Sequence, residues 1–302
     1  MIVDSRSTIH LKAPAKINLF LKVLGRRADG YHDLLSLMAR LKLADELILT
    51  PLGAAGDELT FEKGGSDPQD AGLNVNLDEG FVQDNLVLKA ISALRAEKPE
   101  LGFWRVHINK KIPLAAGLGG GSSDAAAIIK ELGRRAGLEK PRLKTLALNL
   151  GSDLPFFLGP PLALAEGRGE ILSPWAGEPP RHVILVNPGL PLATGRVFQE
   201  LALTKQSDEN NLWPTNRLGS NFPALGENDL LAPALRLAPQ LKSVSAALAG
   251  LGGLAHGLSG SGPTFWALFQ DAAAASRALA SLSGQSWWST RTELDLGHLA
   301  RD

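Results

Sequence analysis

A glycine-rich turn between a predicted strand and a predicted helix offers the clearest chemistry in this sequence. It runs from Pro113 to Ser123 and carries glycine at four of the five positions 117–121. Glycine lets the backbone approach a ligand closely, and the first turn of a helix presents unpaired amides beside the positive end of the helix dipole. This arrangement predicts a phosphate-binding loop. The simpler alternative is a flexible turn with a serine cap.

Two better-known nucleotide motifs are absent from this turn. No Gly-Lys-Ser/Thr sequence ends it, as a Walker A loop requires, and its glycine spacing differs from that of a dinucleotide-binding fingerprint. Ser122 and Ser123 could also supply a hydroxyl to Mg²⁺, because that ion prefers oxygen ligands. The turn therefore indicates a phosphate loop of another kind.

Phosphoryl transfer also needs a carboxylate that accepts the hydroxyl proton and a positive charge near the phosphate. Asp153 and Lys16 are candidates for these two roles. Local pattern alone favours plainer roles, because an Asp before a Pro often caps a helix and a lone strand lysine usually faces solvent. The small residues from Leu258 to Thr264 permit a second close backbone approach to a ligand, or a tight hairpin. Both interpretations stay open.

Composition excludes several classes of function. Lys plus Arg and Asp plus Glu both number 31, so no global field would recruit nucleic acid or an acidic membrane surface. The absence of cysteine excludes disulfides, thiolate metal sites and thiol nucleophiles. The six histidines lack a metal-binding spacing, and no stretch reaches about 18 uninterrupted apolar residues. We expect a cytoplasmic protein that binds neither nucleic acid nor membrane.

Strands and helices alternate along the chain, which favours an α+β or α/β fold. Because 302 residues exceed most single cores, we expect two domains, 1–180 and 181–302, with a cleft between them. Residues 7–23 predict two strands with a bend, and their alternation places Lys16, Asn18 and Phe20 on one face.

The remaining elements follow from periodicity and turn residues. After an apolar run at 34–43, strands are expected near 46–50, 103–109, 182–186, 254–258, 264–269 and 288–294. Helices are expected over 85–97, 122–136, 142–150, 233–251 and 271–282, and long loops over 63–80 and 205–230.

Several segments together resemble the signature motifs of the GHMP kinase superfamily. They are Ala13 to Leu21, Arg27 to His32, Gly117 to Asp124, Gly151 to Phe157, Ala165 to Glu170, Asn228 to Leu230 and Gly260 to Gly262. The resemblance implies an α+β fold of two domains: an N-terminal domain like domain 2 of ribosomal protein S5, with a left-handed βαβ crossover, and a ferredoxin-like C-terminal domain. Two departures are Ser152, where relatives often have Ala, and Pro263, which removes one backbone donor.

The resemblance also implies an ATP- and Mg²⁺-dependent kinase whose substrate is a cytidine diphosphate-linked methylerythritol. Asp153 would be the base, Lys16 its cationic partner, and Asn18 would lie near the transferred group. Tyr31, His32 and Phe198 would bind the cytosine. The ATP site would comprise Pro113, Leu114, Ala115, Ala116, Gly117, Leu118, Gly119, Gly120, Gly121, Ser122 and Ser123, with Asn85 and Lys111 nearby.

The resemblance identifies no metal ligand, and we expect a monomer or a weak homodimer. Two alternative functions stay open. One is the same chemistry on another alcohol, such as homoserine or mevalonate. The other is a nucleotide-binding module that has lost catalysis.

Overall fold

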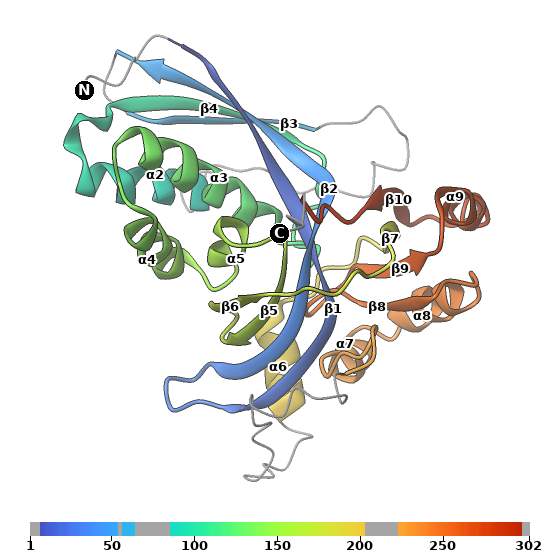
Figure 1. Ribbon diagram of the computed structural model, residues 1–302. Coiled ribbons are helices and arrows are strands. Elements are labelled where there is room, and N and C mark those ends of the chain that lie inside the picture. Colours follow the sequence, from blue (N-terminus) through green and yellow to red (C-terminus); the bar gives the residue numbers. More distant parts are fainter. Residues whose placement is uncertain (1–6, 54–55, 64–84, 203–222, 298–302) are drawn as a thin grey trace.

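Two β-sheets organise the protein (Figure 1). The computed structural model describes residues 7–53, 56–63, 85–202 and 223–297. Within these residues, one sheet is built from strands between positions 9 and 174 and the other from strands between 182 and 293. The boundary predicted at residue 180 lies between the two sheets, and the division into two domains there stays a prediction.

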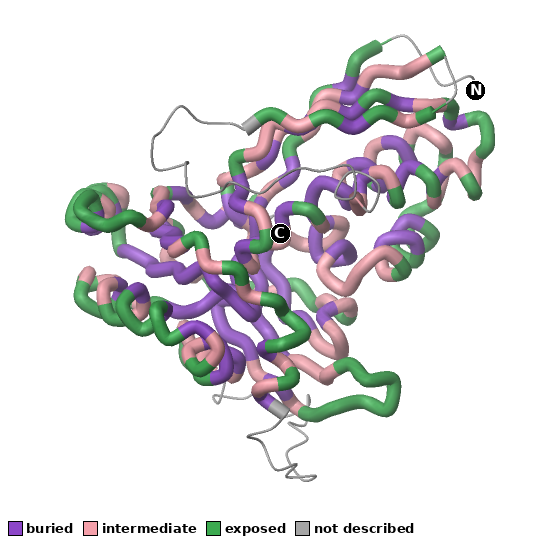
Figure 2. The backbone as a smooth tube through the Cα atoms, turned by 180° about the vertical axis from the view of Figure 1, so that it is seen from behind, coloured by how far each residue is buried: buried purple, intermediate pink, exposed green. Residues whose placement is uncertain are grey.

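A long hairpin forms the spine of the first sheet. Its strands are β1 (Ile9–Arg26) and β2 (His32–Leu52), which pair antiparallel from Ile9 opposite Leu49 to Arg26 opposite His32. The exposed tip, residues 25–31, projects from the molecule (Figure 2). Two predictions about this hairpin are wrong: the break at 13–15 and the separation of 34–43 from 46–50. The β1–β2 ladder continues through both places, and the strands bend where the register is irregular.

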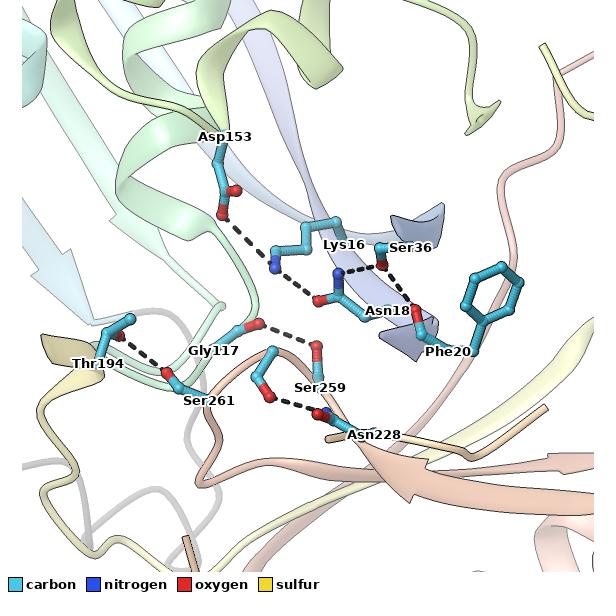
Figure 3. A network of polar contacts seen from close by, with 11 residues as sticks. Lys16, Asn18, Phe20, Ser36, Gly117, Asp153, Thr194, Asn228, Ser259 and Ser261 are labelled. Atoms are coloured by element: carbon cyan, nitrogen blue, oxygen red, sulfur yellow. Dashed lines mark hydrogen bonds and ion pairs between the residues drawn. The ribbon is translucent and has the colours of Figure 1, made fainter. Parts of the chain in front are cut away.

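One of these irregularities changes which side chains face the site. The register shifts between Asn18 and Phe20. An extra residue in one strand moves the following side chains to the opposite face. Phe20 therefore packs into the core with Ile17, and Leu21 takes the next place beside Lys16 and Asn18. The prediction that Phe20 shares their face is wrong, and Figure 3 shows its ring turned away from the polar side chains.

The long strand β2 pairs with different strands along its length. Its C-terminal half pairs with β4 (Phe103–Lys110) and its N-terminal half with β5 (Leu162–Gly167). The edges are β3 (Glu58–Lys63), parallel to β4, and β6 (Ile171–Pro174), antiparallel to β5. Periodicity predicted β4 and missed β3, β5 and β6, which are short and take their place from their neighbours.

Helices cover one face of the first sheet (Figure 1). They are α2 (Leu86–Glu97), α3 (Gly120–Arg135), α4 (Lys140–Leu150) and the short α5 (Leu154–Leu158). The predicted helices 85–97, 122–136 and 142–150 correspond to the first three. Leu94, Ile129 and Leu146 meet strand residues such as Val106 and Leu49 in one apolar cluster. Burial of this face holds the helices on the sheet.

The second sheet is buried on both faces. It contains β7 (His182–Asn187), β8 (Ala255–Leu258), β9 (Phe265–Phe269) and β10 (Trp288–Glu293) in the order β10-β7-β9-β8. Val183 and Leu185 face the first sheet, whereas Ile184 and Val186 face helices. Since alternate strand residues point to opposite faces, this continuous apolar run fits a strand covered on both sides.

The helices beside the second sheet are α6 (Thr194–Ala202), α7 (Leu231–Leu237), α8 (Leu241–Ala249) and α9 (Ala272–Ala280). The prediction of one helix over 233–251 is wrong. Pro239 lies between α7 and α8, and a proline inside a helix removes a hydrogen bond and clashes with the preceding turn. Asp271 caps α9 by accepting from the amide of Ala274 at 2.7 Å.

Both the second sheet and the segment before α7 are hydrogen-bonded to β1. The indole Nε1 of Trp266 donates to the carbonyl of Asn18 at 3.0 Å. The amide of Leu21 donates to the carbonyl of Glu227 at 2.9 Å, so the end of the predicted loop 205–230 runs beside β1. Most of that loop, and nearly all of the predicted loop 63–80, lies outside the described residues. Among the helices described, none combines the length and apolar character needed to cross a membrane.

Candidate active site

A pocket lies where the hairpin, the glycine-rich turn and the second sheet meet. The hairpin contributes Lys16, Asn18 and Ser36, and the turn contributes Gly117 and Gly119. Other segments contribute Asp153, Arg168, Thr194, Phe198, Gly260 and Ser261. Segments far apart in the sequence thus supply the lining.

Lys16 is buried, with 5% of its surface exposed. Its ammonium donates to Asn18 Oδ1 at 2.8 Å and lies 3.5 Å from Asp153 Oδ2. The glycine-rich turn covers the lysine, because the amide of Lys16 donates to the carbonyl of Leu118 at 2.9 Å. A Cβ on Gly119 would come 3.0 Å from Lys16 Cγ. The solvated position typical of a strand lysine is therefore excluded here.

Asp153 occupies the N-cap position of α5, yet its side chain makes no capping hydrogen bond. Its carboxylate is 40% exposed and points to the ammonium of Lys16 (Figure 3). The capping role favoured by the local pattern is thus not performed. The structure brings Lys16 and Asp153 together at the pocket.

Arg40 holds the short helix that carries Asp153. One terminal nitrogen of its guanidinium donates to the carbonyls of Phe156 at 2.7 Å and Gly159 at 2.6 Å. These two carbonyls lie at the C-terminal end of α5 and at its C-cap, so Arg40 holds that end of the helix. Arg40 lies opposite Lys16 in the β1–β2 register. The sequence reasoning missed this residue, since only its place in a mostly apolar run marks it.

Ser36 orients Asn18. The Asn18 amide donates to Ser36 Oγ at 2.8 Å, and that hydroxyl donates to the carbonyl of Phe20 at 2.6 Å (Figure 3). The Asn18 carbonyl oxygen is thereby directed at Lys16. Ser36 was also missed, although a serine within the apolar run 34–43 was a usable signal.

The glycine-rich turn needs glycine for two reasons: its backbone lies close to another segment, and two of its glycines have positive φ angles. Gly117 and Gly119 have φ of +74° and +70°, in the left-handed region. A Cβ on Gly117 would lie 2.6 Å from the carbonyl oxygen of Ser259, so the turn and the segment 258–264 are in backbone contact. Ser259 Oγ also donates to the carbonyl of Gly117 at 2.9 Å. That segment is both the β8–β9 connection and part of the pocket.

The start of α3 has free amide groups for an anion. Its N-cap is Gly119, which offers no side-chain cap, and Ser122 and Ser123 lie inside the helix. The alternative of an ordinary serine cap is therefore wrong. The first-turn amides and the positive dipole end adjoin the loop that lines the pocket.

Two candidates predicted to lie near the nucleotide have other partners. Asn85 caps α2 by accepting from the amide of Val87, and Lys111 pairs with Glu46 at 2.7 Å. Neither lines the pocket. Their place beside the nucleotide stays a prediction.

The three aromatic candidates gather at one side of the pocket. His32 stacks on Phe198 with centroids 4.9 Å apart and planes 25° apart, and Phe198 lines the pocket. The guanidinium of Arg168 lies 4.4 Å from the Tyr31 ring centroid. Burial, assisted by the positive charge of Arg26, lowers the pKa of His32 and favours its neutral form. Arg168 was missed, although a charged residue between two glycines was a signal.

Polar side chains fix the far wall. Asn228 donates to the carbonyls of Leu258 at 2.9 Å and Gly260 at 2.8 Å. The hydroxyls of Thr194 and Ser261 are 2.8 Å apart (Figure 3). The pocket thus combines a cation beside a carboxylate, a glycine loop at a helix start, and an aromatic side. This combination suits transfer of a phosphate to a hydroxyl.

Comparisons with known proteins agree with this chemistry. Models of the N-terminal and C-terminal domains of GHMP kinases match residues 85–159 and 215–286. The 4-diphosphocytidyl-2-C-methyl-D-erythritol kinase of Geobacter sulfurreducens is 37% identical over 280 residues, covering 92% of this chain and 96% of that protein. The protein of the same name from a Bradyrhizobium species is 40% identical over 292 residues, covering 91% and 92%.

Solved structures show the same relationship. A crystal structure of a 4-(cytidine 5'-diphospho)-2C-methyl-D-erythritol kinase has a TM-score of 0.71 and 32% identity, covering 94% of this chain and 99% of the other. Homoserine kinase from Cytophaga hutchinsonii has a TM-score of 0.65, with coverage of 95% of both chains. Its 16% identity makes this a likeness of fold alone.

Proposed function

This chain belongs to the GHMP kinases, in the family of the 4-diphosphocytidyl-2-C-methyl-D-erythritol kinases, and from that premise we propose that it phosphorylates the 2-hydroxyl of 4-diphosphocytidyl-2-C-methyl-D-erythritol with ATP. Its fold is the two-sheet α+β fold of that superfamily, as predicted. The reaction would place the protein in non-mevalonate isoprenoid biosynthesis. The observation that carries the proposal is the Lys16–Asp153 pair, 3.5 Å apart, beside the glycine loop.

Asp153 is the base in this proposal. Its exposed carboxylate accepts the proton of the substrate hydroxyl as the hydroxyl oxygen attacks the γ-phosphorus of ATP and the bond to ADP breaks. Lys16 stabilises the carboxylate and the charge of the transferred group. Its burial strengthens that effect, because charges interact more strongly where water is excluded.

The glycine loop binds the phosphates of ATP in this scheme. Backbone amides of the loop and of the α3 start donate to phosphate oxygens, as is common at helix N-termini. Within the described parts of the chain, no group of three or more His, Asp or Glu side chains could hold a metal ion. Mg²⁺ would bind the ATP phosphates and neutralise their charge.

The aromatic side would bind the cytosine. Phe198 and His32 offer flat apolar surface, and neutral His32 can both donate and accept a hydrogen bond at the edge of a base. The Arg168 and Tyr31 pair lies close by and can attract the diphosphate of the substrate.

Substrate profiling tests the proposed function. Purified protein with ATP and Mg²⁺ is offered the cytidyl substrate, homoserine or mevalonate, and ADP release is measured. We expect ADP release with the cytidyl substrate alone. Equal turnover of another alcohol would favour a GHMP kinase of different specificity, and no turnover of any substrate would favour a non-catalytic nucleotide-binding module.

Asp153→Asn tests the base. The amide cannot accept the hydroxyl proton, so turnover should fall by about 10²- to 10⁴-fold while ATP affinity changes little. Asp271→Asn is the matched control, because Asp271 caps the distant helix α9 and an amide oxygen can still accept from Ala274. Unimpaired turnover of Asp153→Asn would reject the assignment.

A further inference from the structure

Three charged side chains are buried together outside the pocket, behind the glycine loop. Asp45 on β2 is fully buried, Asp124 on α3 is 3% exposed, and the side chain of Lys110 at the end of β4 is 10% exposed. The Lys110 ammonium lies 2.5 Å from Asp45 Oδ2 and 2.9 Å from Asp124 Oδ2. These residues form the Asp45–Lys110–Asp124 cluster, to which the proposed mechanism gives no role.

The cluster holds both ends of the glycine loop. The other carboxylate oxygen of Asp45 accepts from the amides of Lys111 at 2.6 Å and Ile112 at 2.8 Å, the two residues before the loop. Asp124 lies one turn into α3, the helix that the loop opens. Through Lys110, one ammonium therefore joins the start of the loop to the helix at its end. The loop backbone lies between these two fixed points.

Stability alone does not explain these charges. Two carboxylates share one ammonium in a place that excludes water, and apolar residues of similar shape often give equal or greater stability. Burial, opposed by Lys110 and assisted by the charge of Asp45, raises the pKa of Asp124 to about 7. One Asp124 oxygen also lacks a hydrogen-bond partner. Buried polar groups of this kind can instead fix one geometry.

We propose that the Asp45–Lys110–Asp124 cluster positions the glycine loop for the phosphates of the nucleotide, and so sets nucleotide affinity without contacting the nucleotide. The inference rests on the proposed function, in which that loop binds ATP. Asp45, Lys110 and Asp124 are positioning residues. Their loss should affect nucleotide binding and spare the aromatic side of the pocket, which His32 at the start of β2 and Phe198 of α6 build.

Two substitutions at one position separate this role from folding. Asp124→Leu introduces an apolar side chain of nearly the same shape, which cannot bind Lys110. In Asp124→Asn, the side-chain amide can still accept a hydrogen bond from Lys110 and donate one to Asp45. Calorimetry would measure binding of ADP and, separately, of the cytidyl substrate. In Asp124→Leu we expect ADP affinity about tenfold weaker, as for one lost charge-assisted contact. Affinity for the cytidyl substrate and the melting temperature should stay close to wild type, and Asp124→Asn should bind ADP like wild type.

Two other results of these measurements would count against the positioning role. Wild-type ADP affinity in Asp124→Leu would overturn the inference, as would equal losses for both ligands together with a lower melting temperature. If Asp124→Leu does not fold, the same measurements on Asp124→Ala, which adds no volume and favours helix, decide the matter. Failure of the wild-type protein itself to bind ADP would instead reject the proposed function.

Discussion

Lys16 shows how surroundings give a common residue an uncommon role. The glycine loop covers it, its ammonium has Asn18 Oδ1 at 2.8 Å, and the Asp153 carboxylate lies 3.5 Å away. Removing a lysine from water is costly unless such partners replace the hydration. The partners also fix the ammonium at one place. A charge fixed before substrate arrives needs no reorganisation during the reaction, which is how a buried ammonium would assist phosphoryl transfer.

At the same scale, Phe198 is the aromatic residue that both lines the pocket and stacks on His32. Phe198→Leu keeps an apolar side chain and removes the ring. We expect the KM for the cytidyl substrate to rise about threefold to tenfold, the value of one aromatic stack, with the KM for ATP unchanged.

The control for that substitution is Phe103→Leu. The Phe103 ring lies 4.4 Å from the guanidinium of Arg95, away from the pocket, so it tests loss of a ring at a remote position. Steady-state kinetics with each substrate varied in turn makes the comparison. A rise in the KM for ATP, or no rise in the KM for either substrate, would reject the assignment of Phe198 to the cytosine site.

At the scale of elements, α5 is too short to hold Asp153 in place by itself. Isolated short helices are unstable, and this one has five residues. Its position comes from the buried side chains of Phe156 and Phe157 and from the hydrogen bonds of Arg40 to its last carbonyls. Because Arg40 lies opposite Lys16 on the neighbouring strand, one β2 position is linked to both members of the proposed catalytic pair.

Arg40→Met tests that link. The substitution keeps an unbranched apolar stem and removes the donors, so α5 should shift and Asp153 should lose alignment. We expect turnover to fall about tenfold with little change in the KM for ATP, since small misplacements of reacting groups are costly.

Arg95→Met is the matched control. Arg95 also donates to a backbone carbonyl, that of Gly102, and pairs with Asp57, but these contacts lie away from the pocket. If both variants lower the melting temperature alike and only Arg40→Met lowers turnover, the positioning role is supported. Equal effects of the two on turnover would contradict it.

At the scale of the whole molecule, the site exists because two sheets pack against each other. Leu185, Trp266 and Leu268 of the second sheet share an apolar cluster with Ile17 and Leu37 of the first. The hydrogen bond from Trp266 to the carbonyl of Asn18 fixes the second sheet directly to a site residue. Folding of the two parts and formation of the pocket are therefore coupled.

The buried cluster should make overall stability depend on pH. The pKa of Asp124 is raised to about 7 in the folded protein, mainly by burial, and lies near 3.8 when the chain unfolds. The folded state therefore holds the proton that the unfolded state releases, and this contribution to stability is lost as pH rises from about 4 to about 7. Asp124→Asn lacks this titration. The free energy of unfolding of this variant minus that of wild type should therefore be larger at pH 8 than at pH 5. Urea unfolding at both pH values measures the difference, and a constant difference would exclude a raised pKa.

The sequence by itself determined the local features. Glycine density from Gly117 to Gly121 specified the loop, since other residues are strained at the positive φ angles found there. Alternation put Lys16 and Asn18 on one face, and helical periodicity found α2, α3 and α4. These patterns arise from neighbours in the chain. The motif order, read as a family resemblance, supplied the pairing of Lys16 with Asp153, which local pattern opposed.

Tertiary structure decided what depends on partners distant in the sequence. The register shift after Asn18 turned Phe20 into the core, because β2 sets the pairing there. Ser36, Arg40 and Arg168 gained their places only once other strands and helices lay beside them. The same holds for Asp45, Lys110 and Asp124, which come from three separate elements. Local sequence patterns do not predict which distant groups come into contact, because burial of apolar faces against one another determines those contacts.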